Sequence, residues 1–432
     1  MSDRLNVVYV SNALGVGGTE RSLVNFARRL DRARFRARTV TVQEEGPRRA
    51  ELEREGIPVA CAHGDLERLA ELLRGADVVH VFRHGIHEPI VPAAARQAGV
   101  RALVETNIFG AVDTSPDERD FACHLFISKM CLLRYHAWTG GADPAFDERH
   151  RVLYLPVELE RLRAGAPERT EAKRMLGLDP ERPVVGRVGR AADLKWRALL
   201  VDMAPHLLRL RPDAQLLYVG ATPAKRRRLE RLGLLDRVAL PDAGSADDGR
   251  LAVIYAACDV SIGAAAIGES LGLATAEAMA FGIPAVTCST PWADNAQLEL
   301  VENGRTGWIA NHPRPFAEAV AALLDDPDER ARLGAAAAEH VQRLLGPVAL
   351  TRQLERLYDS LAAGRGVPSD WTPSPPEVEA FARDYPRRAR GQYRPLTARE
   401  RLEARAERLR ERAQLASAML DARLTPWRSS RR

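Results

Sequence analysis

The sequence predicts an α/β protein made of two doubly wound domains, each with a parallel sheet. Short apolar segments alternate with amphipathic segments of helical period, first over about residues 5–150 and again over about 183–345. This alternation is typical of a parallel sheet with helices on both faces. The 432 residues, 46% of them hydrophobic, are enough for two or three cores of this kind.

The first domain is predicted over residues 1–160. It opens with a strand at 6–10, a glycine-rich turn with Gly17 and Gly18, and a helix beginning near Glu20. Glycines at such a turn let the backbone approach a ligand closely. The spacing differs from G-x-G-x-x-G, so a tight turn without a ligand is an equal alternative. Further strands are predicted at 38–42, 58–61, 78–82, 102–105 and 124–127, with helices at 48–54, 66–73, 89–97 and after residue 128.

Polar loops follow three of these strands, with the sequences GVGGTE, RHGIHE and ETNIFG. Ligands of doubly wound folds bind beyond the carboxyl ends of the strands. His80, His84 and His87 invite a metal interpretation, but His80 falls inside a predicted strand and the other two in the loop after it. We therefore expect His80 in the core or at a strand end, and His84 in the loop facing a ligand.

A linker is predicted at 161–182, because prolines flank a charged segment with one short helix. The second domain follows at 183–345. Its predicted strands lie within 183–190, 214–220, 237–242, 259–265, 283–289 and 304–310. Its predicted helices lie within 191–210, 224–232, 248–258, 292–301, 314–326 and 327–345, with one more beginning near Ser270.

The most informative segment is 268–284, GESLGLATAEAMAFGIP, in which Glu269 and Glu277 stand eight positions apart. Glu269 precedes the predicted helix and Glu277 lies within it. A helix start offers free N–H groups and the positive end of the dipole to a phosphate. In the alternative interpretation, Glu269 caps the helix and Glu277 is a solvated helix residue. The surrounding segment is too apolar for that, because a buried lone carboxylate costs several kcal/mol. The pattern suits a nucleotide sugar, which carries hydroxyls on both sides of a diphosphate.

Two cations follow the first strand of the second domain, Arg190 at its end and Lys195 five positions later. Both fall on the edge where ligands of such sheets bind. Two cations near a helix start would hold a diphosphate and stabilise it as a leaving group.

These motifs resemble glycosyltransferase family 4, the group 1 type of retaining enzymes with the GT-B fold. The resemblance rests on GESLGLATAEAMAFGIPAV, VGRAADLKW, GVGGTE and ENGRTGWI, and it covers about residues 5–345. It implies two Rossmann-like domains facing across a cleft. The implied catalytic residues are Arg190 and Lys195 on the diphosphate and Glu269 on the sugar hydroxyls. The implied donor-binding residues are Glu277 on the ribose, the backbone of Ser270, Leu271 and Gly272, Gly17 and Gly18 in a closing loop, and Val238 and Leu240 near the base.

The acceptor side departs from the family. Relatives often carry a histidine in the loop filled here by ETNIFG, where Asn107 stands at or next to that place, and an Asn-Gly pair entering the linker, where this chain reads YLPVE. His84, Glu105 and Asn107 are therefore acceptor-side candidates only. We expect no metal and no cofactor besides the nucleotide sugar. The single D-x-D, at 326–328, is better interpreted as a helix-capping turn between two helices.

The end of the chain, 346–432, is predicted as a helical crossover and an arginine-rich tail. Residues 386–432 hold 14 Arg against four Glu and one Asp. A helix at 397–423 begins with a capping box of Thr397 and Glu400 and carries a thin apolar stripe of Leu402, Leu409, Ala416 and Leu420. It is either a solvated helix packed loosely on the body or a basic arm for an anionic membrane surface. Nucleic acid is disfavoured, because Glu interleaves the Arg and no base-reading motif is present.

The location expected from the sequence is the cytoplasm, with peripheral contact to the inner face of the membrane. No run of about 18 apolar residues occurs, and the start MSDRLNVVYVSN lacks a signal-peptide layout. The five cysteines form no C-x-x-C pair and are expected to be buried.

The predicted activity is hexosyl transfer with retention, from a UDP- or GDP-linked sugar to an unknown acceptor, either a cell-envelope glycan or lipid or a small molecule. A sugar-nucleotide epimerase or phosphorylase of the same fold is one alternative. A non-catalytic nucleotide-sugar-binding scaffold is the other.

Overall fold

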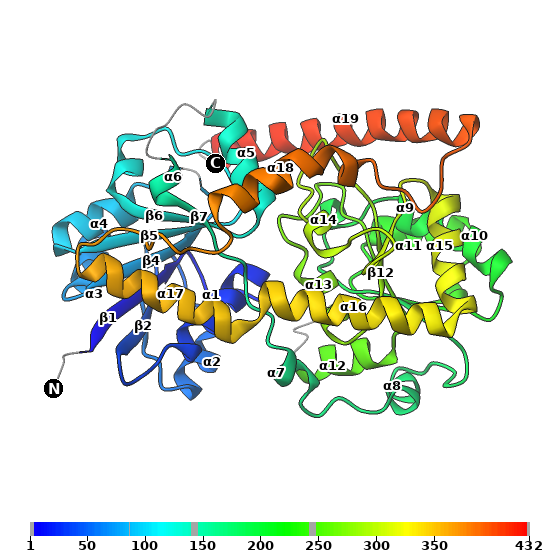
Figure 1. The fold of residues 1–432 in the computed structure, drawn as a ribbon, viewed down its shortest axis with the longest axis horizontal. Coiled ribbons are helices and arrows are strands. Elements are labelled where there is room, and N and C mark those ends of the chain that lie inside the picture. The colour runs from blue at the N-terminus through cyan, green and yellow to red at the C-terminus, as the bar shows by residue number, and fades with distance from the viewer. Residues whose placement is uncertain (1–3, 86, 140–145, 242–247, 430–432) are drawn as a thin grey trace. The chain divides into compact units, whose positions relative to one another are not determined.

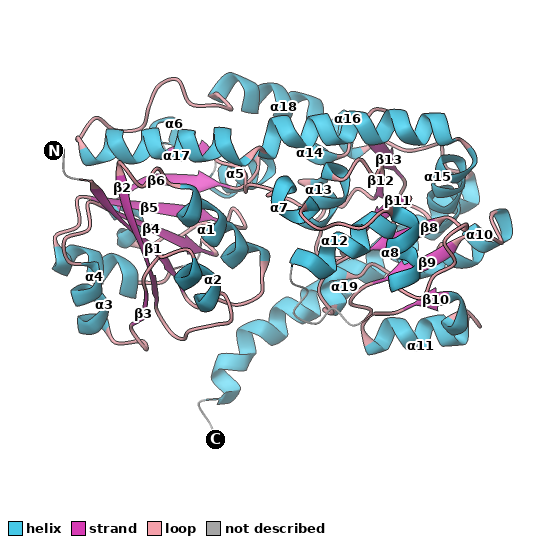
Figure 2. Cartoon of the chain, turned by 90° about the horizontal axis from the view of Figure 1, so that it is seen from below, coloured by secondary structure: helices cyan, strands magenta, loops and turns pink. Residues whose placement is uncertain are grey.

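The computed structural model describes residues 4–85, 87–139, 146–241 and 248–429 and divides the chain into two compact units (Figure 1). Unit 1 comprises Met1–Glu158 and Arg343–Asp384, and unit 2 comprises Leu159–Gln342 and Tyr385–Arg432. Each unit has its own parallel sheet with helices on both sides of the strands (Figure 2). The predicted pair of Rossmann-like sheets is thus confirmed.

The sheet of unit 1 has seven strands in the order β3-β2-β1-β4-β5-β6-β7. The strands are β1 Leu5–Ser11, β2 Phe35–Thr41, β3 Val59–Cys61, β4 Val78–Arg83, β5 Ala102–Asn107, β6 Phe121–Phe126 and β7 His150–Val152. Its helices are α1 Gly18–Arg29, α2 Arg49–Arg54, α3 Leu66–Leu73, α4 Ile90–Ala98, α5 Lys129–Thr139, α6 Phe146–Arg149 and α17 Pro347–Ala362, with a 3-10 turn η1 at Pro116–Asp120. Helix α18, Pro375–Ala389, belongs to unit 1 as far as Asp384. The central strands β1, β4 and β5 are buried along nearly their whole length because helices cover both faces, although β4 and β5 also carry polar residues such as His80 and Glu105.

Helix α17 returns the chain to unit 1 after the first segment of unit 2, Leu159–Gln342, and Figure 1 shows it lying across the strands of unit 1. The Oη of Tyr358 lies 2.6 Å from Nδ1 of His80 on β4 and 3.3 Å from Oη of Tyr9 on β1. The Nε2 of His80 lies 2.7 Å from Oγ1 of Thr106. Burial lowers the pKa of His80 to about 3, so this histidine is a neutral core residue.

The sheet of unit 2 has six parallel strands in the order β10-β9-β8-β11-β12-β13. They are β8 Val184–Arg187, β9 Gln215–Tyr218, β10 Val238–Ala239, β11 Val260–Gly263, β12 Ala285–Thr287 and β13 Gly307–Ile309. The helices are α7 Leu159–Arg163, α8 Arg169–Met175, α9 Leu199–Asp202, α10 Ala204–Leu210, α11 Pro223–Arg231, α12 Asp248–Ala257, α13 Leu273–Ala280, α14 Gln297–Leu300, α15 Pro313–Asp325, α16 Pro327–Leu345 and α19 Ala398–Ser429, with 3-10 turns η2 Asp193–Lys195 and η3 Leu235–Arg237. Its core joins strands β8, β9, β11 and β12 to α9, α10 and α15.

Residues 161–182, predicted as a linker, are part of unit 2. Helices α7 and α8 both pack against α12. Nζ of Lys173 is buried and lies 3.1 Å from a carboxylate oxygen of Asp259, and Arg163 donates a 2.8 Å hydrogen bond to the carbonyl of Ala280. The charged residues that made this segment look solvated are therefore used in packing.

The C-terminal segment is divided between the units. Its first part, 343–384, belongs to unit 1, where the buried indole of Trp371 donates to the carbonyl of Val152 at 2.8 Å. Its second part, 385–432, belongs to unit 2. The predicted capping box of α19 is present: Thr397 N–H donates to Glu400 at 2.8 Å, and Glu400 N–H donates to Thr397 Oγ1 at 3.2 Å.

Helix α19 does not dock through the predicted apolar stripe. Leu402 and Leu409 are 70% and 68% exposed, whereas Glu400, Ala404 and Glu411 are buried. The buried acids are paired, Glu411 with Arg197 at 2.6 Å and Glu400 with Arg394 at 2.8 Å. Ion pairing has thus selected the docked face, and the side chains of Ala416 and Leu420 lie outside the described residues.

Three smaller expectations concern the described part of the chain. All five cysteines are buried and free, as predicted. The carboxylate of Asp326 accepts the N–H of Glu329 at 2.9 Å, which is the predicted capping turn at the start of α16. No described helix is long and apolar enough to cross a membrane.

Candidate functional site

The site predicted in unit 2 is assembled where strands β8 and β11 end. Lys195 lies in η2, and its Nζ donates to Oε2 of Glu269 at 2.7 Å. The two side chains are 22% and 30% exposed, so the pair is accessible from solvent. Arg190 lies on the same loop, is exposed, and has no ion-pair partner among the described residues. The three predicted catalytic residues therefore lie on two loops that Lys195 and Glu269 join directly.

The loop that carries Glu269 is held by close backbone contacts. Gly268 has φ +69°, and a Cβ there would lie 1.6 Å from the carbonyl oxygen of Asp294. Ser270 Oγ donates to the carboxylate of Asp294, and the carbonyl of Glu269 accepts the N–H of Ala296 at 2.8 Å. The segment 294–296 thus fixes the position of residues 268–270.

Helix α13 begins at Leu273, three residues later than predicted. Gly272 is its N-cap with φ +94°, a left-handed conformation that cannot continue a helix. The prediction that a helix starts near Ser270 is therefore wrong. Ser270, Leu271 and Gly272 belong to the loop before α13, with the Leu271 side chain buried.

Glu277 lies in the middle of α13 and is 7% exposed. Tyr255 of α12 donates a 2.7 Å hydrogen bond to its Oε2. A buried carboxylate needs such partners. Glu277 is therefore a buried, hydrogen-bonded residue, as its apolar surroundings predict, and not a solvated helix residue.

Arg187, at the end of β8, was not singled out from the sequence. Its guanidinium is buried, donates to the carbonyls of Val219 at 2.8 Å and Lys195 at 2.7 Å, and lies 3.8 Å from the ring centroid of Trp196. Burial lowers the pKa of Arg187 to about 10, against the attraction of the Glu269 charge. Arg187 therefore positions the backbone of the loop that carries Lys195. The signal was an arginine inside the strand motif PVVGRVGR.

The residues predicted near the base are partly used by the core. Val238 of β10 is buried in the hydrophobic core, and Leu240 packs against it at the edge. The chain directly after β10, residues 242–247, lies outside the described residues.

In unit 1, Gly17 and Gly18 stand at the start of α1, at the carboxyl end of β1. Gly17 is the N-cap, and its carbonyl accepts the N–H of Arg21 at 3.1 Å. Val16 beside them is 58% exposed. The predicted glycine-rich turn between strand and helix is therefore present.

The acceptor-side candidates have different surroundings. Glu105 is 1% exposed and binds Arg83 at 2.8 Å and His124 at 2.5 Å. Asn107 is 1% exposed; its side chain accepts the N–H of Gly110 at 2.8 Å and donates to the carbonyl of Ala111 at 2.9 Å. Both side chains are used within the fold. His84 is exposed, with its ring 5.2 Å from that of Phe109, and is the candidate that a ligand can reach.

A buried ionic cluster lies behind Glu105. His124 of β6 contacts Glu105 through Nδ1 and Glu118 of η1 through Nε2, the latter at 3.0 Å. Burial opposes a charge on His124, but its hydrogen bonds to Glu105 and Glu118 outweigh that and raise its pKa. The hydrogen bond from His124 lowers the pKa of Glu118 to about 2. The two carboxylates therefore favour the protonated form of His124.

Within the described residues, Glu118, His124 and His150 are close enough to hold a metal ion, with ligand atoms within 4.8 Å of one another. The rings of His124 and His150 are stacked, with centroids 4.9 Å apart and planes 13° apart. Nδ1 of His124 is hydrogen-bonded to Glu105, whereas its Nε2 lies 3.0 Å from Glu118 without hydrogen-bond geometry. The metal site that the sequence disfavours would involve His80, His84 and His87, which are not the residues of this cluster.

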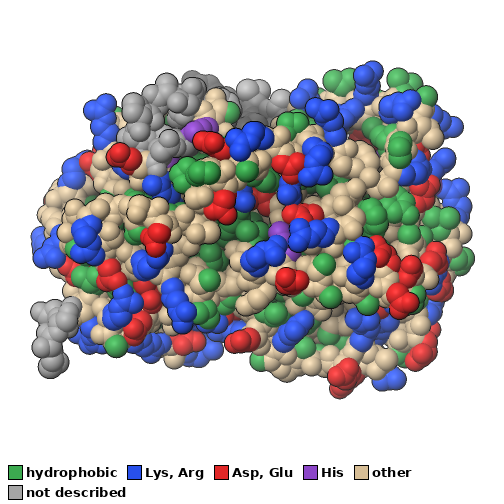
Figure 3. Space-filling view, viewed as in Figure 1, with side chains coloured by type: hydrophobic (Ala, Val, Ile, Leu, Met, Phe, Trp, Pro, Cys, Tyr) green, Lys and Arg blue, Asp and Glu red, His purple; other side chains and the backbone are tan. Residues whose placement is uncertain are grey.

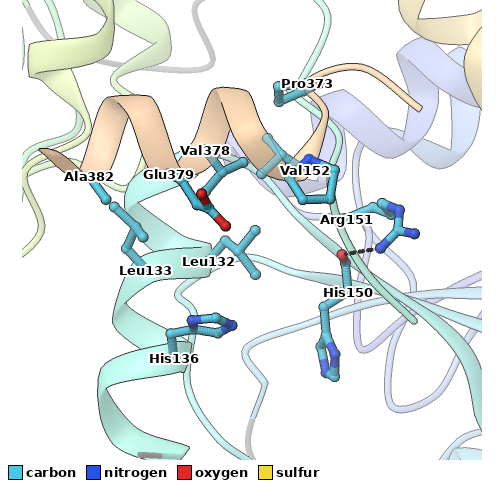
Figure 4. A pocket seen from close by; sticks show the side chains of 11 residues that line it. Leu132, Leu133, His136, His150, Arg151, Val152, Pro373, Val378, Glu379 and Ala382 are labelled. Atoms are coloured by element: carbon cyan, nitrogen blue, oxygen red, sulfur yellow. Dashed lines mark hydrogen bonds between the residues drawn. The ribbon is translucent and has the colours of Figure 1, made fainter. Parts of the chain in front are cut away.

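A cavity of about 210 Å³ lies in unit 1 between α5, β7 and the segment 373–382 (Figure 4). His136, His150 and Arg151 line it beside Leu132 and Val378, and Arg151 donates to the carbonyl of His150 at 2.9 Å. None of the predicted site residues lines this cavity.

Comparison with known proteins points to one family. The family model described as Glycosyl transferases group 1 matches residues 182–326. The chain is 30% identical over 285 residues to the D-inositol 3-phosphate glycosyltransferase of Corynebacterium glutamicum (strain R), covering 63% of this chain and 62% of that protein. It is 32% identical over 256 residues to the lipopolysaccharide core biosynthesis mannosyltransferase LpsB of Rhizobium meliloti (strain 1021), covering 55% and 69%.

The chain therefore spans less than two-thirds of the first of these relatives and slightly more than two-thirds of the second. Among solved structures, Anabaena HepE in complex with UDP and glucose matches with a TM-score of 0.68 at 18% identity, covering 83% of this chain and all of that one. This likeness shows a shared fold.

Proposed function

The chain belongs to the group 1 glycosyl transferases, and we propose on that basis that it transfers a hexosyl group from a nucleoside diphosphate sugar to an acceptor, with retention of configuration. The observation that supports this proposal most is the pairing of Lys195 with Glu269 at the end of the second sheet, beside the exposed Arg190. A cation that is held by a carboxylate and still open to solvent is suited to a charged ligand.

In the proposed reaction an acceptor hydroxyl attacks the anomeric carbon of the sugar from the face of the leaving group and forms the new C–O bond. The bond between the sugar and the diphosphate breaks, and the diphosphate leaves with additional negative charge and takes up the hydroxyl proton. Arg190 and Lys195 stabilise that charge as preorganised cations. Glu269 then binds sugar hydroxyls while it keeps Lys195 in place. The carboxylate of Glu277, which Tyr255 holds in place, accepts hydrogen bonds from the hydroxyls of the ribose.

For the donor we propose a UDP-linked hexose first and a GDP-linked hexose second. The complex of HepE with UDP and glucose supports this order. For the acceptor we propose a cell-envelope glycan or lipid, in line with LpsB, which is named for lipopolysaccharide core biosynthesis. Such an acceptor is met at the inner face of the membrane, and the basic segment 386–432 is the part of the chain suited to an anionic surface.

A thermal-shift screen against UDP-, GDP-, ADP- and dTDP-sugars tests the donor. Ligand at about 100 times its dissociation constant stabilises a protein by roughly 2.7 kcal/mol. We expect one nucleotide class to raise the melting temperature and the Glu277→Gln variant to lose the shift. If no nucleotide sugar shifts the wild type, the proposal is refuted.

Product analysis tests the reaction itself. A transferase consumes the donor together with an acceptor and forms a glycoside with retained anomeric configuration. Conversion of the donor into another nucleotide sugar without any acceptor would identify an epimerase instead. Binding with neither reaction, across candidate acceptors, would indicate a scaffold.

A further inference from the structure

Unit 2 has a second cavity, apart from the residues proposed to bind the donor. It has a volume of about 460 Å³ and lies between the loops that follow β12 and β13 and the C-terminal segment from Tyr385 to Arg408. A hollow of about 470 Å³ lies beside it, and the two share Pro291, Trp292 and Arg408 as lining residues. None of the predicted donor residues lines either space.

The walls of this cavity are basic. Arg390 and Arg408 line it, and neither has an ion-pair partner within the described part of the chain. Other arginines of the same segment are paired, for example Arg388 with Glu302 at 3.2 Å. Arg405 and Arg412 of α19 line the adjoining hollow, also without a described ion pair. Figure 3 shows that basic side chains are spread over the visible face of the molecule and are not confined to one part of it.

At the bottom of the cavity lies Arg197, whose side chain is 2% exposed. Its Nε donates to Glu411 at 2.6 Å, whereas its Nη1 and the Nε1 of Trp292 are buried without a hydrogen-bond partner among the described residues. A buried donor left unpaired is destabilising. An acceptor supplied from outside the chain can satisfy these two donors; Oε1 of Glu407 and Oε2 of Glu411 are likewise buried without a hydrogen-bond partner among the described residues.

Other polar side chains near the cavity are either hydrogen-bonded within the fold or are acidic residues of α19. Asn311 accepts the N–H of Ser289 at 2.7 Å, and Tyr385 accepts a hydrogen bond from Asn295 at 2.9 Å. The acidic groups of α19 near it are Glu403, Glu407 and Glu411. Glu403 binds His312 at 3.0 Å and Glu411 binds Arg197, while burial raises the pKa of Glu407. Neither Arg390 nor Arg408 forms a described ion pair with these acids.

From this arrangement we propose that the cavity between the β12 and β13 loops and the C-terminal segment binds a phosphate group, held by Arg390, Arg408 and Arg197. A planar guanidinium can donate two parallel hydrogen bonds to the oxygens of one phosphate. A solvated surface arginine donates its hydrogen bonds to water instead. Trp292, Pro291 and Leu396 form an apolar wall for the remainder of the ligand. The phosphate is carried either by a phosphorylated sugar or by a lipid headgroup. The proposal does not depend on the proposed transferase activity.

The test measures phosphate binding directly with the full-length protein and no nucleotide sugar. Glucose 6-phosphate titrated by calorimetry probes the free source, and cosedimentation with phosphatidylglycerol vesicles probes the lipid source, with phosphatidylcholine vesicles as the uncharged reference. We expect binding to one of the two probes. We also expect the double variant Arg390→Ala/Arg408→Ala to weaken it at least about tenfold, the loss expected for charge-assisted hydrogen bonds.

The matched control is Arg227→Ala/Arg410→Ala, which removes the same charge from exposed positions of unit 2 that line neither space. We expect it to change the affinity less than about twofold. All four arginines are exposed, so melting curves should stay within about 1 °C of wild type. An equal loss in both double variants would reveal diffuse attraction to a basic surface and overturn the proposal. Absence of binding to both probes would overturn it as well.

Discussion

Lys195 Nζ lies 2.7 Å from Glu269 Oε2, and this contact joins two residues 74 positions apart in the chain. One comes from the turn after β8 and the other from the loop before α13. The carbonyl of Lys195 is held in turn by the buried Arg187 at 2.7 Å. The cation and the carboxylate are therefore fixed from both sides before any ligand arrives.

Because the pair acts as one unit, we expect Lys195→Met and Glu269→Gln to be non-additive in kcat/KM. Contacting residues typically couple by about 0.5–3 kcal/mol. Each single variant should lose activity, and the double variant should be little worse than the more damaged single one. Steady-state kinetics of the four proteins measure the coupling. Strict additivity would show that the two side chains work independently.

Arg190→Ala should lower kcat about 100-fold, since one preorganised charge on the departing diphosphate is removed. Arg190 is exposed and carries no described ion pair, so the melting temperature should not change. Arg227→Ala, an exposed arginine on α11, is the control and should retain wild-type kcat. Wild-type turnover in Arg190→Ala would remove this residue from the proposed site.

Glu277→Gln should raise the KM for the donor about 10- to 100-fold with a smaller effect on kcat, because hydrogen bonds to a charged group contribute about 1.5–3 kcal/mol. Tyr255→Phe removes only the hydroxyl that holds this carboxylate and should raise KM less. Donor binding by calorimetry checks both variants. A larger loss in Tyr255→Phe than in Glu277→Gln would contradict a ribose-binding role for Glu277.

Gly268→Ala should destabilise unit 2 by about 3 kcal/mol or more, since its Cβ would overlap the carbonyl oxygen of Asp294. Gly233 is the matched control: its φ is also positive, at +66°, but a Cβ there meets nothing within 4 Å. Gly233→Ala should cost only about 1–2 kcal/mol, the ordinary left-handed penalty. Thermal unfolding should separate the two, at about 2–4 °C per kcal/mol for a unit of this size. Equal shifts in melting temperature would mean that the loop before α13 can rearrange to accommodate the Cβ.

Two buried histidines of unit 1 should have pKa values shifted in opposite directions from the ordinary value. ¹H–¹³C NMR of the imidazoles can measure both. We expect the pKa of His124 above the ordinary 6.5, and that of His80 at about 3. His124 then contributes stability that is present below pH 6.5 and lost as the pH rises through its own raised pKa. His80 costs stability as the pH falls from 6.5 towards 3, because the unfolded chain binds the proton more readily.

The variant His124→Gln separates these effects. It should remove the loss of stability on the alkaline side and keep the loss between pH 6.5 and 4.5, to which His80 contributes. Between pH 4.5 and about 2 the variant should lose less stability than wild type, because His124 no longer lowers the pKa of Glu118. A wild-type His124 that titrates below 6.5 would show that Glu105 and Glu118 do not hold it as an imidazolium.

Much of the fold was predictable because its information is local. The segment 66–73 shows its helical period within eight residues, and α3 occupies the same range. The strand at 78–82 is recognisable from its largely apolar residues, interrupted by His80, which is what burial on both faces favours. The buried state of Glu277 could also be inferred locally, from the apolar residues around it.

Other features depended on residues far away in the chain. The start of α13 at Leu273 follows from the left-handed Gly272 in a loop pinned to Asp294 and Ala296. Glu105 and Asn107 looked available for an acceptor, but Arg83, His124 and the turn at 107–111 use their side chains. A single sequence does not indicate which polar side chains satisfy one another.

By itself, the sequence determined the two parallel α/β sheets and the residue types at the ends of their strands, since hydrophobic period and turn chemistry act over a few residues. Only the tertiary structure decided that Lys195 meets Glu269, that Tyr358 of α17 returns to His80 of β4, and that α19 docks through Glu400 and Glu411 and not through its leucines. The contacts Lys195–Glu269, Arg197–Glu411 and His80–Tyr358 link positions 74, 214 and 278 residues apart, whereas Glu400 pairs with Arg394 six positions away. Their partners are chosen by packing and by the need to pair buried charge, which no local pattern encodes.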